Sequence, residues 1–185
     1  NAEYTEAKNE EARINGRIMD IEQILRVFPR LLAACPDVRF VLVGEGPLRE
    51  ELAGMAHELG VSHAVILTGP KPWEQIDRYY AIGDVFCSAS HTETQGLTYV
   101  EAMASGLCVC AANDPCLNGV IEDGVSGILT GDSDEEMLAG LLRAFSEEGR
   151  RIAASAAGYA EPFGAEHFAA HVEACYEQAI QNRRT

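Results

Sequence analysis

Short apolar runs alternate with segments of helical periodicity along most of this chain, and this alternation is the feature that most restricts its fold. The runs that predict strands lie at residues 39–43, 64–67, 84–87, 107–111 and 127–129. The segments that predict helices lie at residues 21–34, 47–59, 73–82, 97–104, 134–145, 150–157 and 165–180. Strands that alternate with helices are typical of a parallel sheet. We therefore expect an α/β fold, a Rossmann-like parallel sheet with helices on both faces.

Three segments follow from this pattern. Residues 1–20 form an irregular N-terminal segment that is too polar for a buried strand, and the chain is expected to be part of a longer protein. Residues 21–164 carry the alternating pattern and form the main domain. Residues 165–185 contain a final helix.

The charge balance excludes one class of partner and restricts another. The formal net charge is -15, whereas binding to nucleic acid requires a basic surface that neutralises phosphates. The same charge argues against attachment to an anionic membrane through charge alone, and no apolar run is long enough to span a bilayer. The six cysteines lie mostly in apolar runs. With no signal peptide visible, we expect reduced thiols and a cytoplasmic protein.

Residues 88–106 are the most informative stretch for function. This stretch begins at the end of a predicted strand and opens a helix, which is where open parallel sheets bind ligands. The free N–H groups near Gly96 and Leu97 can hold an anion, and a glycine lets a phosphate approach the backbone closely. Glu93 and Glu101 can face the same crevice and accept hydrogen bonds from sugar hydroxyls.

Structural explanations compete with these functional ones. Thr98-x-x-Glu101 fits a capping box, in which Glu101 only satisfies backbone donors. Cys108 and Cys110 share one face of a strand and fit core packing better than a metal site. A further alternative is a zinc site on one helix face, formed by His167, His171 and Cys175.

The two glutamates also carry a resemblance to a known family. Glu93 and Glu101, with seven residues between them, match the paired-glutamate motif of retaining family 4 glycosyltransferases, which have the GT-B fold. The segment Thr92-Glu-Thr-Gln-Gly-Leu-Thr-Tyr-Val-Glu-Ala-Met-Ala resembles in particular the bacterial 1,2-diacylglycerol 3-glucosyltransferases. The similarity extends from about Arg26 to Gly131. It includes the segments 42–47, 68–73, 79–80, 83–86 and 122–127.

The resemblance implies roles for the residues around the paired glutamates. Glu93 would be the catalytic residue and would bind hydroxyls of the donor sugar. Glu101 would bind the ribose hydroxyls. The backbone around Gly96, Leu97 and Thr98 would hold the diphosphate.

The resemblance also implies a second group of donor-binding residues. Gly44, Glu45 and Gly46 would line the crevice, and Gly69 and Lys71 would lie near the uracil. Family members usually need no metal, so no metal and no cofactor are expected.

The Gly-Arg segment departs from the family pattern. Gly16-Arg17 matches the family's Gly-Arg, so that Arg17 would bind the diphosphate, but the lysine expected five residues later is Glu22 in this chain. A diphosphate on an acidic domain needs local positive charge. Other cations near the motifs are Lys71, Arg49 and Arg78.

The function that the resemblance implies is that of the C-terminal, donor-binding half of a GT-B glycosyltransferase. This half would supply a hexose, expected to be glucose, from a UDP-sugar to diacylglycerol or another hydroxyl acceptor. The lipid acceptor would bind an N-terminal domain, onto which helix 165–185 would cross. Membrane contact, peripheral and on the inner face, would need the full-length protein, and this chain alone would be an inactive half. Two alternatives remain open: a non-catalytic nucleotide-binding domain, and a sugar-nucleotide epimerase of the same fold.

Overall fold

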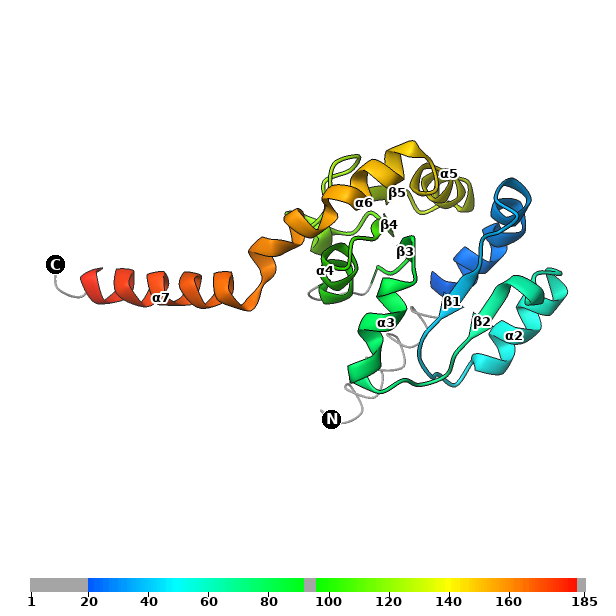
Figure 1. The fold of residues 1–185 in the computed structure, drawn as a ribbon, viewed down its shortest axis with the longest axis horizontal. Coiled ribbons are helices and arrows are strands. Elements are labelled where there is room, and N and C mark those ends of the chain that lie inside the picture. The colour runs from blue at the N-terminus through cyan, green and yellow to red at the C-terminus, as the bar shows by residue number, and fades with distance from the viewer. Residues whose placement is uncertain (1–19, 92–95, 183–185) are drawn as a thin grey trace, which may run out of the picture.

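The computed structural model describes residues 20–91 and 96–182, and the described strands form two parallel sheets. The strands are β1 (Phe40–Leu42), β2 (Val65–Leu67), β3 (Val85–Ser88), β4 (Cys108–Ala112) and β5 (Ile128–Thr130). The helices are residues 20–34, α2 (Arg49–Glu58), α3 (Ile76–Ala81), α4 (Leu97–Ala104), α5 (Asp134–Ala144), α6 (Glu147–Ala160) and α7 (Ala165–Asn182) (Figure 1). The alternation of strands and helices expected from the sequence is confirmed.

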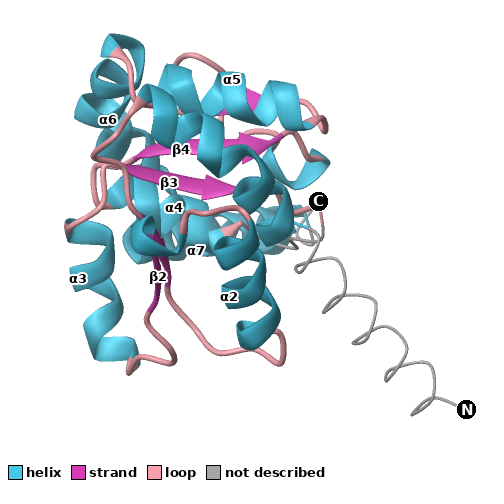
Figure 2. Ribbon diagram, turned by 90° about the vertical axis from the view of Figure 1, so that its right-hand side faces the viewer, coloured by secondary structure: helices cyan, strands magenta, loops and turns pink. Residues whose placement is uncertain are grey.

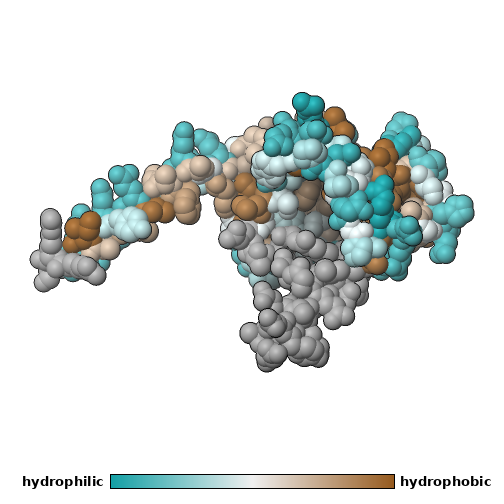
Figure 3. Space-filling view, turned by 90° about the horizontal axis from the view of Figure 1, so that it is seen from below, coloured by the Kyte–Doolittle hydropathy of each residue, from teal (hydrophilic) through white to brown (hydrophobic). Residues whose placement is uncertain are grey.

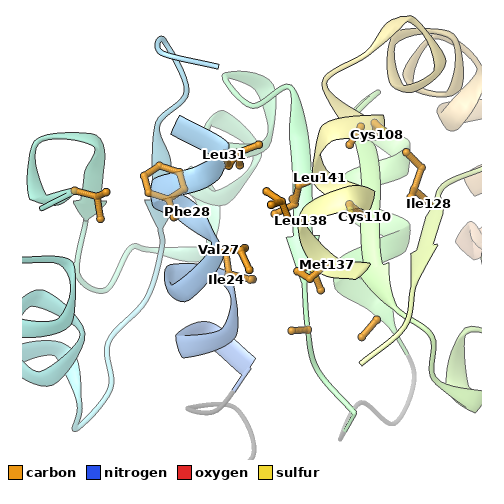
Figure 4. Packing of buried hydrophobic residues seen from close by; sticks show 14 of the residues in the cluster. Ile24, Val27, Phe28, Leu31, Cys108, Cys110, Ile128, Met137, Leu138 and Leu141 are labelled. Carbon is orange, nitrogen blue, oxygen red and sulfur yellow. The ribbon is translucent and has the colours of Figure 1, made fainter. Parts of the chain in front are cut away.

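The three-stranded sheet, in the order β3-β4-β5, has helices on both faces. Every residue of β4 is buried, because its successive side chains enter two different hydrophobic clusters. Cys108 and Cys110 pack with α5 and the helix over residues 20–34. Val109 and Ala111 pack on the opposite face, with α4 and α6. Figure 4 shows the first of these clusters, where the helix over residues 20–34 faces α5.

The packing role expected for Cys108 and Cys110 is confirmed. Both side chains are buried, and burial raises the pKa of Cys108 to about 11. Burial also raises the pKa of Cys110. A buried protonated thiol behaves as a small apolar group, so these two cysteines contribute to the core. All six cysteines are free thiols.

The remaining strands, β1 and β2, form a parallel pair of their own. Phe40 of β1 packs its ring against Phe28 of the helix over residues 20–34, with 5.8 Å between centroids. The opposite face of the pair stays open, since Val41 is 36% exposed and Ile66 is 47% exposed. Figure 2 shows that β2 runs across the direction of β3 and β4. The expected helix-flanked parallel architecture is therefore present, divided between two sheets, and β1 is less buried than its apolar run indicates.

The helix over residues 20–34 is tied to the start of α5 by polar contacts. Gln23 donates from Nε2 to the carbonyl oxygen of Asp132 over 2.8 Å. The Arg26 guanidinium donates to both carboxylate oxygens of Asp134, over 3.0 and 3.2 Å. α5 itself begins at a capping box made by Ser133 and Glu136. These contacts hold the helix beside the carboxyl end of β5.

The last helix, α7, extends away from the rest of the molecule (Figure 1). Most of its residues are exposed. One side of α7 carries apolar side chains (Figure 3), which belong to Phe168, Val172, Tyr176 and Ile180. Among the described residues, no helix combines the length and the apolar character that crossing a bilayer requires.

Candidate functional site

The carboxyl ends of β3, β4 and β5 lie at one edge of their sheet, because the three strands are parallel. His91, which follows β3, connects the segments after the other two strands. Its Nδ1 lies 4.0 Å from Oδ2 of Asp114, and its Nε2 lies 3.4 Å from Oδ1 of Asp132. The backbone N–H of Asn113 also donates to the carbonyl oxygen of Thr130 over 2.9 Å. This edge is the place where an open parallel sheet binds its ligand.

Asp114 is held in its charged form at this edge. Burial alone would raise the pKa of Asp114, but the N–H of Cys116, which donates to Oδ1 over 2.8 Å, and the neighbouring His91 lower that pKa below its ordinary value. The carboxylate thereby caps the short 3-10 turn Pro115–Leu117. The Asp114-Pro115 pair is the sequence signal for such a cap, an aspartate followed by proline at the first helical position, but it does not indicate the proximity to His91.

The lowered pKa of Asp114 predicts a pH dependence of stability. The charged form stabilises the fold in full above the unfolded pKa of about 3.9, and this contribution is lost as the pH falls through the lower folded-state pKa. We expect Asp114→Asn to reduce the free energy of unfolding at neutral pH by up to about 1 kcal/mol. The difference from the unmodified chain should shrink below pH of about 4.

Thermal melts of the unmodified chain and of the Asp114→Asn variant between pH 3 and pH 7 measure this difference in stability. Asp132→Asn is the matched control, since the Asp132 side chain is 82% exposed and its charge should contribute little. A gap between the Asp114→Asn variant and the unmodified chain that stays constant over the whole pH range would contradict the prediction.

Gly96 begins α4 in the left-handed conformation, with φ 62° and ψ 25°. A Cβ built on Gly96 would lie 3.2 Å from Cδ2 of Tyr99, so both the backbone angle and the space favour glycine. Leu97 and Thr98 follow as the first two residues of the helix, and both are exposed. Because the first N–H groups of a helix have no acceptor within it, Gly96, Leu97 and Thr98 lie where an anion can bind.

The capping-box interpretation of Thr98 and Glu101 is wrong. The residue before the helix is Gly96, and no side chain caps it among the described residues. Thr98 is already the second residue of the helix, so it does not occupy the capping position that the motif requires. Glu101 instead accepts a hydrogen bond from the hydroxyl of Tyr80, with 2.9 Å between Oη and Oε2.

Tyr80 is a site residue that the sequence pattern did not reveal. The helical spacing of Trp73, Tyr79 and Tyr80 favours packing over stacking on a base or lipid, and the Tyr80 ring does pack against Phe86, with 6.1 Å between centroids. Phe86 and Tyr99 form a T-shaped ring pair, with 5.7 Å between centroids, and the Tyr99 hydroxyl donates to Oγ of Ser88 over 2.9 Å. No sequence signal identifies the contact with Glu101, because the two partners lie 21 residues apart.

The second group of candidate residues follows β1 and β2. The N–H of Gly44 donates to the carbonyl oxygen of Gly69 over 3.2 Å, so the two loops adjoin. Gly69 is in the left-handed region, and a Cβ there would lie 3.3 Å from Nη1 of Arg49. Arg49 also donates to the carbonyl oxygen of Leu67 over 2.9 Å and lies 4.0 Å from Glu45. Arg49 therefore has local partners, which makes it a weaker candidate for a diphosphate.

The other candidates of this group differ in exposure. Gly46 is exposed and Lys71 is half-buried in the loops after β1 and β2. Arg78 is exposed on α3. The structure brings Gly44, Glu45 and Gly69 together in the loops that follow the two-stranded sheet, whereas Gly96 to Glu101 form the start of α4, which packs on the three-stranded sheet.

Two candidates, Glu93 and Arg17, lie outside the described residues. Their roles stay predictions. The zinc alternative is not supported, because the part of the chain that the structure describes contains no group of three His, Cys, Asp or Glu side chains able to hold a metal ion. His167, His171 and Cys175 lie on the exposed helix α7.

Comparison with known families decides which family this architecture represents. The family described as glycosyl transferases group 1 matches residues 16–162. The chain belongs to this family. The match covers both sheets, the glycine that begins α4 and the pair of glutamates.

Curated relatives of this group 1 glycosyltransferase chain include enzymes named for glycolipids. The chain is 39% identical to the alpha-monoglucosyldiacylglycerol synthase of Streptococcus pneumoniae over 110 residues, and this alignment covers 60% of the chain and 25% of the relative. The chain is 34% identical to the synthase of the same name in Acholeplasma laidlawii over 115 residues, and this alignment covers 62% of the chain and 29% of the relative. The chain thus spans about a quarter to a third of the length of these relatives.

Solved glycosyltransferase structures share the fold of this group 1 chain. Anabaena HepE, solved in complex with UDP and glucose, has a TM-score of 0.64 and 27% identity over 73% of this chain and 39% of its own. The pneumococcal O-GlcNAc transferase GtfA, in complex with UDP and GlcNAc, has a TM-score of 0.75 and 22% identity, over 86% of this chain and 33% of its own. The fold is that of the GT-B glycosyltransferases.

Proposed function

We propose that this chain is the donor-binding half of a retaining glycosyltransferase that takes a hexose from a UDP-sugar. The observation that carries the proposal is the start of α4. There, Gly96 opens a helix N-terminus at the carboxyl edge of a parallel sheet, and Glu101 lies one turn into the helix with its carboxylate not used for capping. A helix N-terminus suits a diphosphate, and a carboxylate suits the hydroxyls of a ribose.

The UDP-sugar class is supported by a relative with sequence similarity as well as shared fold. Anabaena HepE, which is 27% identical to this chain, was solved with UDP and glucose. In the proposed arrangement Gly96, Leu97 and Thr98 hold the diphosphate, Glu101 binds the ribose and Glu93 binds the sugar and acts in catalysis. Gly44, Glu45 and Gly46 line the crevice, Gly69 and Lys71 lie near the uracil, and Arg17 contributes to binding the diphosphate.

The diphosphate needs no metal ion in this proposal. Its charge is offset by the N–H groups at the start of α4 and by a cation such as Lys71. Stabilisation of the departing diphosphate is then mainly electrostatic.

Glucose as the sugar and diacylglycerol as the acceptor are supported by the names of the two synthases that resemble the chain. The acceptor would bind an N-terminal domain of the complete enzyme. The exposed apolar side of α7 would pack on that domain, because an apolar stripe on a helix is normally covered. The complete enzyme would then contact the inner face of the membrane peripherally.

Titration of the chain with UDP, and with UDP-glucose, GDP-mannose and NAD for comparison, tests the proposal. We expect UDP and UDP-glucose to bind and NAD not to bind. Glu101→Gln should raise the dissociation constant for UDP by roughly tenfold, since a hydrogen bond to a charged acceptor contributes about 1.5–3 kcal/mol and the amide retains one acceptor oxygen. Glu58→Gln, on exposed α2 surface, is the matched control and should bind UDP normally.

The outcome separates the proposal from its alternatives. UDP binding that does not respond to Glu101→Gln would contradict the donor site. UDP binding without sugar transfer by the full-length enzyme would favour a non-catalytic nucleotide-binding domain. Interconversion of a UDP-sugar with no acceptor present would favour an epimerase.

A further inference from the structure

We infer that Tyr80 positions Glu101 for the ribose, and that this contact gives the site its preference for ribonucleotides over nucleotides that lack the ribose hydroxyls. The inference rests on the proposed function, in which Glu101 accepts hydrogen bonds from the ribose. Tyr80 does not touch the donor in this arrangement. It acts through the carboxylate of Glu101.

The contact joins two helices that the chain does not connect directly. Tyr80 lies on α3, before β3, and Glu101 lies on α4, after it. The Tyr80 hydroxyl donates to Oε2 of Glu101 over 2.9 Å, and both residues are half-buried. The Tyr80 ring packs against Phe86 of β3, at 6.1 Å between centroids. The sheet therefore holds the ring that carries the hydroxyl.

A fixed donor on one oxygen orders the whole carboxylate. A free glutamate side chain loses rotamer entropy when it is ordered, and this loss would otherwise accompany donor binding. The tyrosine hydroxyl occupies one acceptor position on Oε2, and a carboxylate offers about four such positions. Oε1 and the rest of Oε2 stay available to the ribose.

The direction of the hydrogen bond is also set. Burial, and then the hydrogen bond and the negative charge of Glu101, raise the pKa of Tyr80 above its ordinary value. The tyrosine hydroxyl therefore keeps its proton and acts as the donor. Glu101 remains the acceptor toward both Tyr80 and the ribose.

The neighbouring Tyr79 provides a control on the same helix. Tyr79 is also half-buried, and within the described ranges its hydroxyl has no hydrogen bond. Tyr79→Phe removes the same atom as Tyr80→Phe, one residue away, without breaking a contact to Glu101. Both substitutions keep the aromatic ring, so packing against Phe86 is preserved in Tyr80→Phe.

The test is titration of the chain and its Tyr80→Phe, Tyr79→Phe and Glu101→Gln variants with UDP and with 2′,3′-dideoxyuridine 5′-diphosphate. We expect the unmodified chain to prefer UDP. Tyr80→Phe should weaken UDP binding about three- to tenfold and leave the affinity for the dideoxy nucleotide unchanged, so that the preference shrinks. Tyr79→Phe should change neither affinity. In the full-length enzyme, Tyr80→Phe should raise KM for the UDP-sugar and leave kcat nearly unchanged.

Three results would overturn the inference. In the first, Tyr80→Phe keeps the full preference while Glu101→Gln removes it, which leaves the proposed function standing. In the second, Tyr80→Phe weakens the binding of UDP and of the dideoxy nucleotide equally, which indicates that Tyr80 has a structural role alone. In the third, Glu101→Gln has no effect on UDP, which overturns the proposed function and this inference together.

Discussion

Gly149→Ala is expected to lower the free energy of unfolding by at least about 3 kcal/mol. Gly149 is buried in the first turn of α6, and a Cβ built there would overlap the carbonyl oxygen of Ala144 at the end of α5. The obstacle is backbone, which cannot turn away as a flexible side chain can. α6 would have to move, and α6 packs against α4, α5 and β4.

Gly158→Ala is the matched control for this prediction, since it makes the same change in the same helix. A Cβ on Gly158 would meet no described atom within 4 Å, and alanine is favoured over glycine inside a helix by about 0.5–1 kcal/mol. In thermal melts we expect Gly149→Ala to lower the melting temperature by at least about 6 °C and Gly158→Ala to raise it by about 1–4 °C. Equal shifts of the same sign would show that α6 moves freely against α5.

Gly96→Val is expected to abolish measurable binding of UDP as well as to destabilise the fold. A β-branched residue is a genuine outlier in the left-handed region that Gly96 occupies, at a cost of roughly 1–2 kcal/mol. The added side chain would also press on Tyr99, 3.2 Å from the Cβ position. The chain at the start of α4 would have to shift, and with it the N–H groups proposed to hold the diphosphate. We therefore expect the UDP dissociation constant to rise by at least about a hundredfold. This corresponds to a loss of about 2.8 kcal/mol of binding free energy, at about 1.4 kcal/mol for each factor of ten.

Gly106→Val separates backbone strain from loss of the donor site. Gly106 follows the other end of α4, also at positive φ, and a Cβ there would meet no described atom within 4 Å. The Gly106→Val variant should lose about 1–2 kcal/mol of unfolding free energy through backbone strain and should still bind UDP normally. Calorimetric titration and chemical unfolding of the two variants measure both quantities. If Gly96→Val binds UDP as well as Gly106→Val does, the start of α4 does not hold the diphosphate.

The fold could be predicted in large part because its signals are local. The apolar runs that became β3 and β4, and the glycine-terminated helices between the strands, depend on residues that are neighbours in sequence. The position of the candidate site followed from the same logic, since residues 88–106 leave a strand and enter a helix. Gly96 at the start of α4 could be expected from the role that the resemblance gave it.

The details within the site could not be predicted in this way. Thr98 and Glu101 have the spacing of a capping box, but that motif forms only if Thr98 precedes the helix as its cap, and the helix begins at Leu97. Helix ends depend on the packing of the whole helix as well as on its first residues. The sequence pattern alone could not decide between the two positions.

The sequence by itself determined the order of strands and helices, the family and the stretch that carries the paired glutamates, because periodicity and motifs are encoded in short segments. Only the tertiary structure decided that the strands divide between two parallel sheets. It also decided that Tyr80 reaches Glu101 and that His91 lies between Asp114 and Asp132. These contacts join side chains from separate helices or from the segments that follow separate strands, and their geometry depends on how those elements pack together, which no local pattern records.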